Sequence, residues 1–281
     1  MKNTIFFLLP CIMTLAGCMP KTIYPIYKTE YSQTMFQKDN MIVYEDDNCT
    51  VTYNLWSEYG NAGFVFFNKS EENIYVNLHE SFFIRNGIAY DYFRGRAFSE
   101  ASRSHTTVSR AYTPMAYTGD NATVAGITAI ANIATAVSGN AVAASSSESK
   151  SESVTFQEQE TICIPPNAAK IVYEYNVQET LFKDCELPNT PTKNQIITKN
   201  YSMQDAPIMF SNIISYTVGH AQENIIIKND FYVSQIANYP ESEVTEVITV
   251  DECGKPLYGS KRYFKDVTPD KFYIKYEEFQ N

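Results

Sequence analysis

Few side chains in this sequence have the type and spacing that catalysis requires. The three histidines, His79, His105 and His220, lie far apart in different local contexts. Spacing alone does not exclude a Ser-His-Asp triad, because triads assemble in space. The sequence contains, however, no G-x-S-x-G elbow, HExxH helix, Walker loop or GxGxxG fingerprint. We therefore expect surface or structural histidines and no enzymatic activity.

The acidic side chains form three adjacent pairs, Asp46-Asp47, Glu71-Glu72 and Glu277-Glu278. Two carboxylates that face each other across a cleft could hydrolyse a glycoside. Neighbouring residues on a strand point to opposite faces, however, and none of the pairs has the spacing of a calcium loop. We therefore expect solvated charges at these positions, with no bound metal and no cofactor.

Four aromatic residues are the best candidates for a binding face. Trp56 is predicted on the outer face of its strand, with Tyr75, Tyr90 and Tyr92 near it in the same meander. Aromatic rings with polar neighbours can stack on a sugar or dock a protein. The same rings could instead pair across strands and cover one sheet, and this second interpretation is the one we favour.

The N-terminal segment has the features of an export signal. Lys2 precedes an apolar run over residues 5–15, which is shorter than the ~20 residues that span a bilayer. The run ends in Leu15-Ala16-Gly17-Cys18, which resembles the lipobox of bacterial lipoproteins. The alternative is a secreted protein with an incidental cysteine beside its cleavage site.

The resemblance to lipoproteins implies cleavage between Gly17 and Cys18 and attachment of palmitate-type acyl chains at Cys18. Two or more chains hold a protein firmly, at roughly 0.8 kcal/mol for each buried methylene. No aspartate follows Cys18 directly. By this resemblance we expect an outer-membrane protein that faces the periplasm rather than the cell surface.

Four cysteines lie beyond the leader, Cys49, Cys163, Cys185 and Cys253. An even number in an exported chain suggests disulfides, with three connectivities that the sequence cannot separate. Buried free thiols are the equal alternative, because strand cysteines pack well in cores. The spacing contains no CxxC pair, which argues against zinc.

The elements that would position these residues are predicted to be short strands. In residues 49–56 and 74–79 apolar and polar side chains alternate with period two. Asn86-Gly87 stands between two aromatic-rich strands, as a two-residue hairpin requires. Successive strands with turns predict a mainly β, antiparallel, immunoglobulin-like sandwich. The exception is residues 120–150, where an alanine-rich stretch, residues 124–137, predicts an amphipathic helix or a disordered insertion.

We expect four parts along the chain: a signal peptide (1–17), a lipidated tether (18–40), a β-sandwich domain (41–187) with an insertion (94–153), and a C-terminal β region (188–281) in the same or a second domain. The net charge of −10 repels nucleic acid. In style the chain is similar to uncharacterised lipoproteins of gut Bacteroidetes.

Three hypotheses for function follow. The leading one is a non-enzymatic structural or binding module, fixed to the membrane, that acts on another envelope protein. The second is a surface adhesin or glycan-binding lipoprotein that uses the region of Trp56 and Tyr75. An envelope hydrolase is the third.

Overall fold

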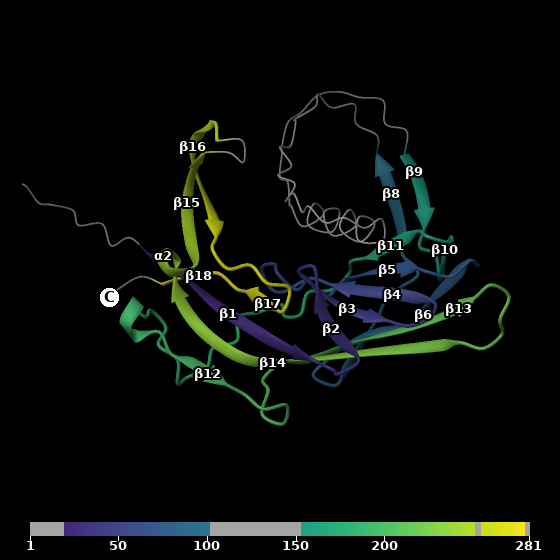
Figure 1. Ribbon diagram of the computed structural model, residues 1–281, viewed down its shortest axis with the longest axis horizontal. Coiled ribbons are helices and arrows are strands. Elements are labelled where there is room, and N and C mark those ends of the chain that lie inside the picture. Colours follow the sequence, from purple (N-terminus) through teal and green to yellow (C-terminus); the bar gives the residue numbers. More distant parts are fainter. Residues whose placement is uncertain (1–19, 102–152, 251–253, 279–281) are drawn as a thin grey trace, which may run out of the picture.

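The computed structural model describes residues 20–101, 153–250 and 254–278. Within these ranges, residues 98–101, 153–156, 250 and 256–261 are described by their backbone alone. Two antiparallel sheets make up the body of the molecule, and two hairpins project from it at opposite ends (Figure 1).

The larger sheet has nine strands in the order β10-β6-β13-β14-β1-β17, with β7 beside β6, β12 beside β14 and β18 beside β1. Its strands are β1 (Lys21–Tyr31), β6 (Ile74–Arg85), β7 (Ile88–Asp91), β10 (Thr161–Ile164), β12 (Thr198–Asn200), β13 (Met209–Val218), β14 (Ile225–Pro240), β17 (Lys271–Tyr273) and β18 (Tyr276–Glu278).

The smaller sheet has five strands in the order β11-β5-β4-β3-β2. They are β2 (Met35–Lys38), β3 (Met41–Glu45), β4 (Cys49–Tyr53), β5 (Phe64–Asn68) and β11 (Ala169–Val172). The two hairpins pair β8 (Ala97–Ala101) with β9 (Ser153–Gln157) and β15 (Thr245–Val250) with β16 (Pro256–Phe264). The described helices are a 3-10 turn, η1 (Lys193–Gln195), and a single α-helical turn, α2 (Glu241–Val244).

The two sheets pack face to face around one apolar core. Rings from the smaller sheet contact rings from the larger one: Phe66 meets Tyr216 with centroids 5.4 Å apart, and Tyr53 meets Phe231 at 5.1 Å. All four side chains are at most 2% exposed. Burial of rings from both inner faces is the packing of a β-sandwich. The predicted mainly β, antiparallel sandwich is therefore confirmed.

The strongest local signals in the sequence have the structure that they predict. In β6 the side chains of Ile74, Val76 and Leu78 lie in the core and are 7% exposed or less. Asn86 and Gly87 join β6 to β7 with φ angles of 48° and 82°. Two positive φ angles in a two-residue loop match the right-handed twist of the flanking strands, which is why Asn-Gly is favoured there.

The expected tether over residues 18–40 is wrong for most of its length, because residues 21–31 form β1 and residues 35–38 form β2. Strand β1 pairs with β14 along one edge and with β17 and β18 along the other. Its polar residues and Pro25 conceal it in the sequence. Pro25 lies between the stretches paired with β17 and with β18, so its missing N–H interrupts no ladder there.

The C-terminal region contributes strands to the same large sheet as the N-terminal half. Strand β13 pairs with β6, and β14 pairs with β1. Between the two halves, β8 lies near the start of the expected insertion (94–153), and β9, its partner, begins at the last residue of that insertion. The helix expected within residues 120–150 lies outside the described residues. In the described part of the chain, no helix is long and apolar enough to cross a membrane.

Candidate functional site

The sequence candidates for catalysis are not gathered at one site. His79 is exposed beside an irregularity of β6, where its ring meets Phe93 at 6.0 Å. His220 is exposed in the turn after β13, and His105 lies outside the described residues. Among the residues that the structure describes, no group of three or more His, Cys, Asp or Glu side chains could hold a metal ion.

Of the acidic pairs, Asp46-Asp47 contains a carboxylate with a defined structural role. The Oδ1 of Asp46 accepts hydrogen bonds from the backbone N–H groups of Asn48 and Cys49, at 2.8 and 2.7 Å. Its Oδ2 accepts a hydrogen bond from the hydroxyl of Tyr216 on the facing sheet, at 2.9 Å. Asp46 thus closes the turn before β4 and ties it to β13, and both of its oxygens are occupied.

The four aromatic candidates do not form one binding face, and Tyr75 is half-buried on β6. Tyr92 is 2% exposed and belongs to the core, where its hydroxyl donates to Asn212. Tyr90 is half-buried against Tyr175, with ring centroids 5.8 Å apart. Trp56 instead joins a separate aromatic cluster with Tyr24, Phe264 and Tyr273. The interpretation of these rings as cross-strand and core packing holds for Tyr90 and Tyr92.

The cysteines whose side chains the structure describes carry free thiols. Cys49 is buried in β4, whereas Cys163 and Cys185 are exposed. Burial, together with the neighbouring Asp46 carboxylate, raises the pKa of the Cys49 thiol above its ordinary range. Cys253, Cys18 and the cleavage position at Gly17 lie outside the described residues.

A concave feature at which several polar side chains converge lies beside Trp56. This Trp56 pocket has a volume of about 220 Å³. It is built on the large sheet, the helical turn α2 and the chain that leaves β16. Its lining residues are Ile26, Lys28, Trp56, Thr198, Gln235, Ala237, Tyr239, Glu243, Val244, Phe264, Lys265, Asp266 and Lys271.

The floor of the Trp56 pocket is the outer face of the large sheet. Ile26 and Lys28 flank Tyr27, which is fully buried in the core, so their side chains point to the opposite face. The strand register places Lys28 directly between Gln235 on β14 and Lys271 on β17. A row of polar side chains thus crosses three neighbouring strands at the bottom of the pocket.

The wall of the Trp56 pocket is held by the aromatic cluster. The Trp56 ring stands edge-on to Phe264 at 5.0 Å and lies tilted to Tyr273 at 5.3 Å. Phe264 and Tyr273 are themselves 4.5 Å apart. These contacts fix the orientation of the indole, because each ring blocks rotation of the next.

Of the three lysines that line this pocket, Lys28 is the one whose amino group has no partner among the described residues. Lys271 makes an ion pair with Asp266 at 2.7 Å, and Glu243 makes one with Lys193 at 3.3 Å. Lys265 donates a hydrogen bond to the carbonyl oxygen of Ser242 at 2.7 Å. No carboxylate of the described residues lies within ion-pair distance of the Lys28 amino group, so its charge is available to a ligand.

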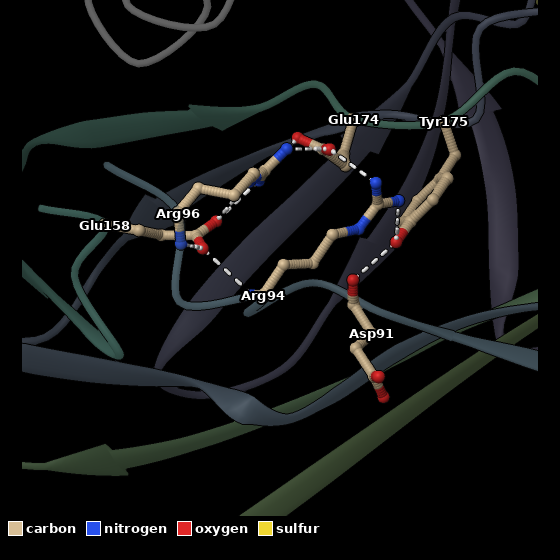
Figure 2. Close-up of polar contacts among 6 residues, drawn as sticks. All are labelled: Asp91, Arg94, Arg96, Glu158, Glu174 and Tyr175. Atoms are coloured by element: carbon tan, nitrogen blue, oxygen red, sulfur yellow. Dashed lines mark hydrogen bonds and ion pairs between the residues drawn. The ribbon is translucent and has the colours of Figure 1, made fainter. Parts of the chain in front are cut away.

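A second polar cluster lies at the base of the β8–β9 hairpin and is drawn in Figure 2. The Arg96 guanidinium lies between the carboxylates of Glu158, which follows β9, and Glu174, which follows β11. Glu158 also accepts hydrogen bonds from the backbone N–H groups of Arg94 and Arg96, at 2.9 and 3.0 Å. The side-chain hydrogen bonds from Arg96 lower the pKa of Glu158 to about 2.

The same cluster reaches the core through a tyrosine. Arg94 donates a hydrogen bond to the Tyr175 hydroxyl at 2.6 Å, and that hydroxyl donates to the carbonyl oxygen of Asp91. Tyr175 is 8% exposed and stacks on Phe83, with centroids 5.1 Å apart. The cluster therefore clamps the hairpin to the sandwich, and every polar group in it has a protein partner.

Comparison with known proteins gives no further guide. No protein-family model, no curated protein and no solved structure matches the chain.

Of the residues that line the Trp56 pocket, Trp56 alone was singled out from the sequence, and the others were not predicted. They come from strands and turns between Ile26 and Lys271, so no local pattern joins them. The available signal was the alternation of Ile26, Tyr27 and Lys28, which places a lysine on the outer face of a buried strand.

Proposed function

We propose that this chain is a bacterial lipoprotein of the outer membrane whose sandwich serves as a non-enzymatic structural or binding module facing the periplasm. The lipobox Leu15–Cys18 supports the anchor. The negative charge of the chain argues against a nucleic-acid partner. The partner is instead another envelope protein.

The observation that carries the proposal is the start of β1. This strand begins at Lys21, three residues after Cys18, and lies inside the large sheet between β14 and the two C-terminal strands. Acyl chains on Cys18 would therefore be joined to a rigid sheet by Met19 and Pro20 alone. Such a short link keeps the module close to the bilayer, whereas a long flexible linker would let it move over a larger volume.

The short link also limits how far the Trp56 pocket can stand from the membrane. Lys28 on the pocket floor lies ten positions after Cys18, and a fully extended chain spans at most about 3.6 Å for each position. The Cα atom of Lys28 is therefore within ~36 Å of the Cα atom of Cys18. A partner or ligand must be reached within that distance of the membrane.

The test of the anchor is replacement of Cys18 by alanine in the producing cell. We expect Cys18→Ala to abolish labelling with a palmitate analogue and to release the chain from the membrane fraction. Cys11→Ala is the matched control, because Cys11 lies in the same leader outside the lipobox. Membrane retention of Cys18→Ala equal to that of Cys11→Ala would refute the lipid anchor.

The side of the membrane needs its own measurement. Protease added to intact cells should leave the chain whole, and permeabilisation of the outer membrane should expose it to cleavage. Cleavage in intact cells would place the sandwich outside and favour the second candidate function.

That second candidate is capture of a glycan, and the Trp56 pocket favours it. An indole held beside hydrogen-bonding side chains is the usual arrangement for stacking on a sugar ring. The test is the variant Trp56→Ala. Glycan binding by this variant equal to that of the parent would refute the second candidate function.

A further inference from the structure

We propose that the Trp56 pocket binds a single acidic sugar unit, whose carboxylate is paired with Lys28. This inference deepens the second candidate function above and rests on it. It is independent of the lipid anchor.

The size of the Trp56 pocket selects a small ligand. Sites for drug-sized molecules enclose roughly 300–1,000 Å³. The pocket, at about 220 Å³, is below that range. It has room for about one monosaccharide unit, so the rest of a longer glycan would lie outside the pocket, on the surface of the protein.

The charge of the pocket selects an anion. Three lysines and two carboxylates line it, and the contacts of Lys265 and Lys271 are made within the protein. Lys28 remains, partly buried on the sheet floor next to Lys271. An ammonium group that is partly removed from water beside a second ammonium group gains most from a ligand carboxylate, through a charge-assisted hydrogen bond.

The uncharged side chains of the pocket favour a ligand that has hydroxyl groups and a sugar ring. Gln235 lies opposite Lys28 on β14, and Thr198 lies opposite Ala237. Their amide and hydroxyl groups can both donate and accept, as hydroxyl groups of a sugar require. Trp56 on the wall supplies a flat apolar surface for the C–H face of a pyranose. An aliphatic carboxylate would use Lys28 but leave these groups without partners.

The single tryptophan of the chain provides the measurement. Because Trp56 is the one tryptophan in the sequence, fluorescence excited at its absorption edge reports on the pocket alone. We expect glucuronate, titrated into the full lipidated protein in detergent, to change this emission with a Kd on the order of 1 mM. Glucuronamide, which keeps the ring and hydroxyls but has no charge, should bind about ten-fold more weakly or worse.

A pair of lysine variants tests the role of Lys28. Lys28→Gln should weaken glucuronate binding about ten-fold or more and leave glucuronamide binding unchanged. Lys38→Gln is the control, because Lys38 is an exposed lysine on β2 in the other sheet. Circular dichroism of both variants should match that of the parent, since each side chain points away from the core.

Three results would overturn the inference: unchanged emission at concentrations far above 1 mM, equal binding of glucuronate and glucuronamide, or equal glucuronate binding by Lys28→Gln and Lys38→Gln. None of these results bears on membrane attachment, which is measured separately by Cys18→Ala. Failure of the pocket proposal and failure of the anchor are thus distinguishable.

Discussion

Asn212 and Asn229 lie opposite each other on β13 and β14, and both side chains are completely buried between the two sheets. Each reaches across the sandwich: Asn212 donates to the carbonyl oxygen of Ala62 at 3.0 Å, and Asn229 donates to the Tyr53 hydroxyl at 2.8 Å. A buried amide without partners costs free energy, so these bonds fix how the two sheets face each other.

Because Asn212 is buried, removal of the Tyr92 hydroxyl that bonds to it should destabilise the fold. The Tyr92 hydroxyl donates to Oδ1 of Asn212 at 2.5 Å. Tyr92→Phe should leave that oxygen unpaired and lower the free energy of unfolding by about 1–3 kcal/mol, measured by urea denaturation. Tyr232→Phe, which removes an exposed hydroxyl bonded to Glu30, should cost less than about 0.5 kcal/mol. Equal effects of the two substitutions would contradict the buried network.

Substitution of two glycines with positive φ distinguishes the cost of backbone strain alone from the cost of strain together with a steric clash. Gly60 and Gly87 have φ angles of 75° and 82°, but an added Cβ at Gly60 would come within 2.9 Å of Phe272 and Val177, and one at Gly87 would meet nothing within 4 Å. Gly87→Ala should cost about 1 kcal/mol of stability, and Gly60→Ala roughly 2–4 kcal/mol. Thermal unfolding of the two variants checks the order. A larger loss at Gly87 would mean that the Gly60 turn is not packed against β17 as described.

Acid should weaken the clamp at the base of the β8–β9 hairpin. Arg96 holds the pKa of Glu158 at about 2, below its ordinary value of 4.5. A carboxylate with a lowered folded-state pKa contributes its stability above the unfolded pKa and loses it as the pH falls toward the folded one. The melting temperature should therefore fall between about pH 4.5 and pH 2 more steeply in the parent than in Glu158→Gln.

The control for the acid titration is Glu179→Gln. Glu179 also pairs with an arginine, Arg85, but its side chain is 69% exposed. An exposed pair contributes little, so this variant should keep the pH dependence of the parent. Identical curves for Glu158→Gln and the parent would show that the clamp does not stabilise the fold.

Thiol labelling should separate the cysteines by burial. Cys163 and Cys185 are exposed, so iodoacetamide should modify both in the native protein. Cys49 is buried and the pKa of its thiol is raised, so it should react after denaturation. Peptide mass spectrometry assigns each site. Protection of Cys163 or Cys185 that reductant removes would instead show a disulfide.

The sequence predicted correctly those turns and strands that depend on a few adjacent residues. The Asn86-Gly87 turn and the alternation in β6 each depend on a few adjacent residues, and both are present in the structure. Strand β1 was missed because its partners, β14 and β17, are about two hundred residues away in sequence. Its Pro25 is tolerated because of a break between β17 and β18, and no local pattern contains that break.

The candidate site was harder to predict for the same reason. Trp56 was singled out as an exposed aromatic residue, but its neighbours Phe264 and Tyr273 come from the far end of the chain. Lys28 can be assigned to the pocket when the strand register that places it beside Lys271 and Gln235 is known. Residue type indicated what the site could contact, and long-range strand pairing decided which residues form it.

The position of β1 has a mechanical consequence. A pull on the chain at Lys21, directed along the strand, loads the β1–β14 pairing from Ile23–Pro240 to Tyr31–Phe231 in shear, so that all of its hydrogen bonds resist together. A hairpin at the rim of the sheet would unzip one bond at a time under the same force. The residues closest to Cys18 thus enter the fold through a joint that resists extension, and tension applied there is distributed across the whole width of the larger sheet.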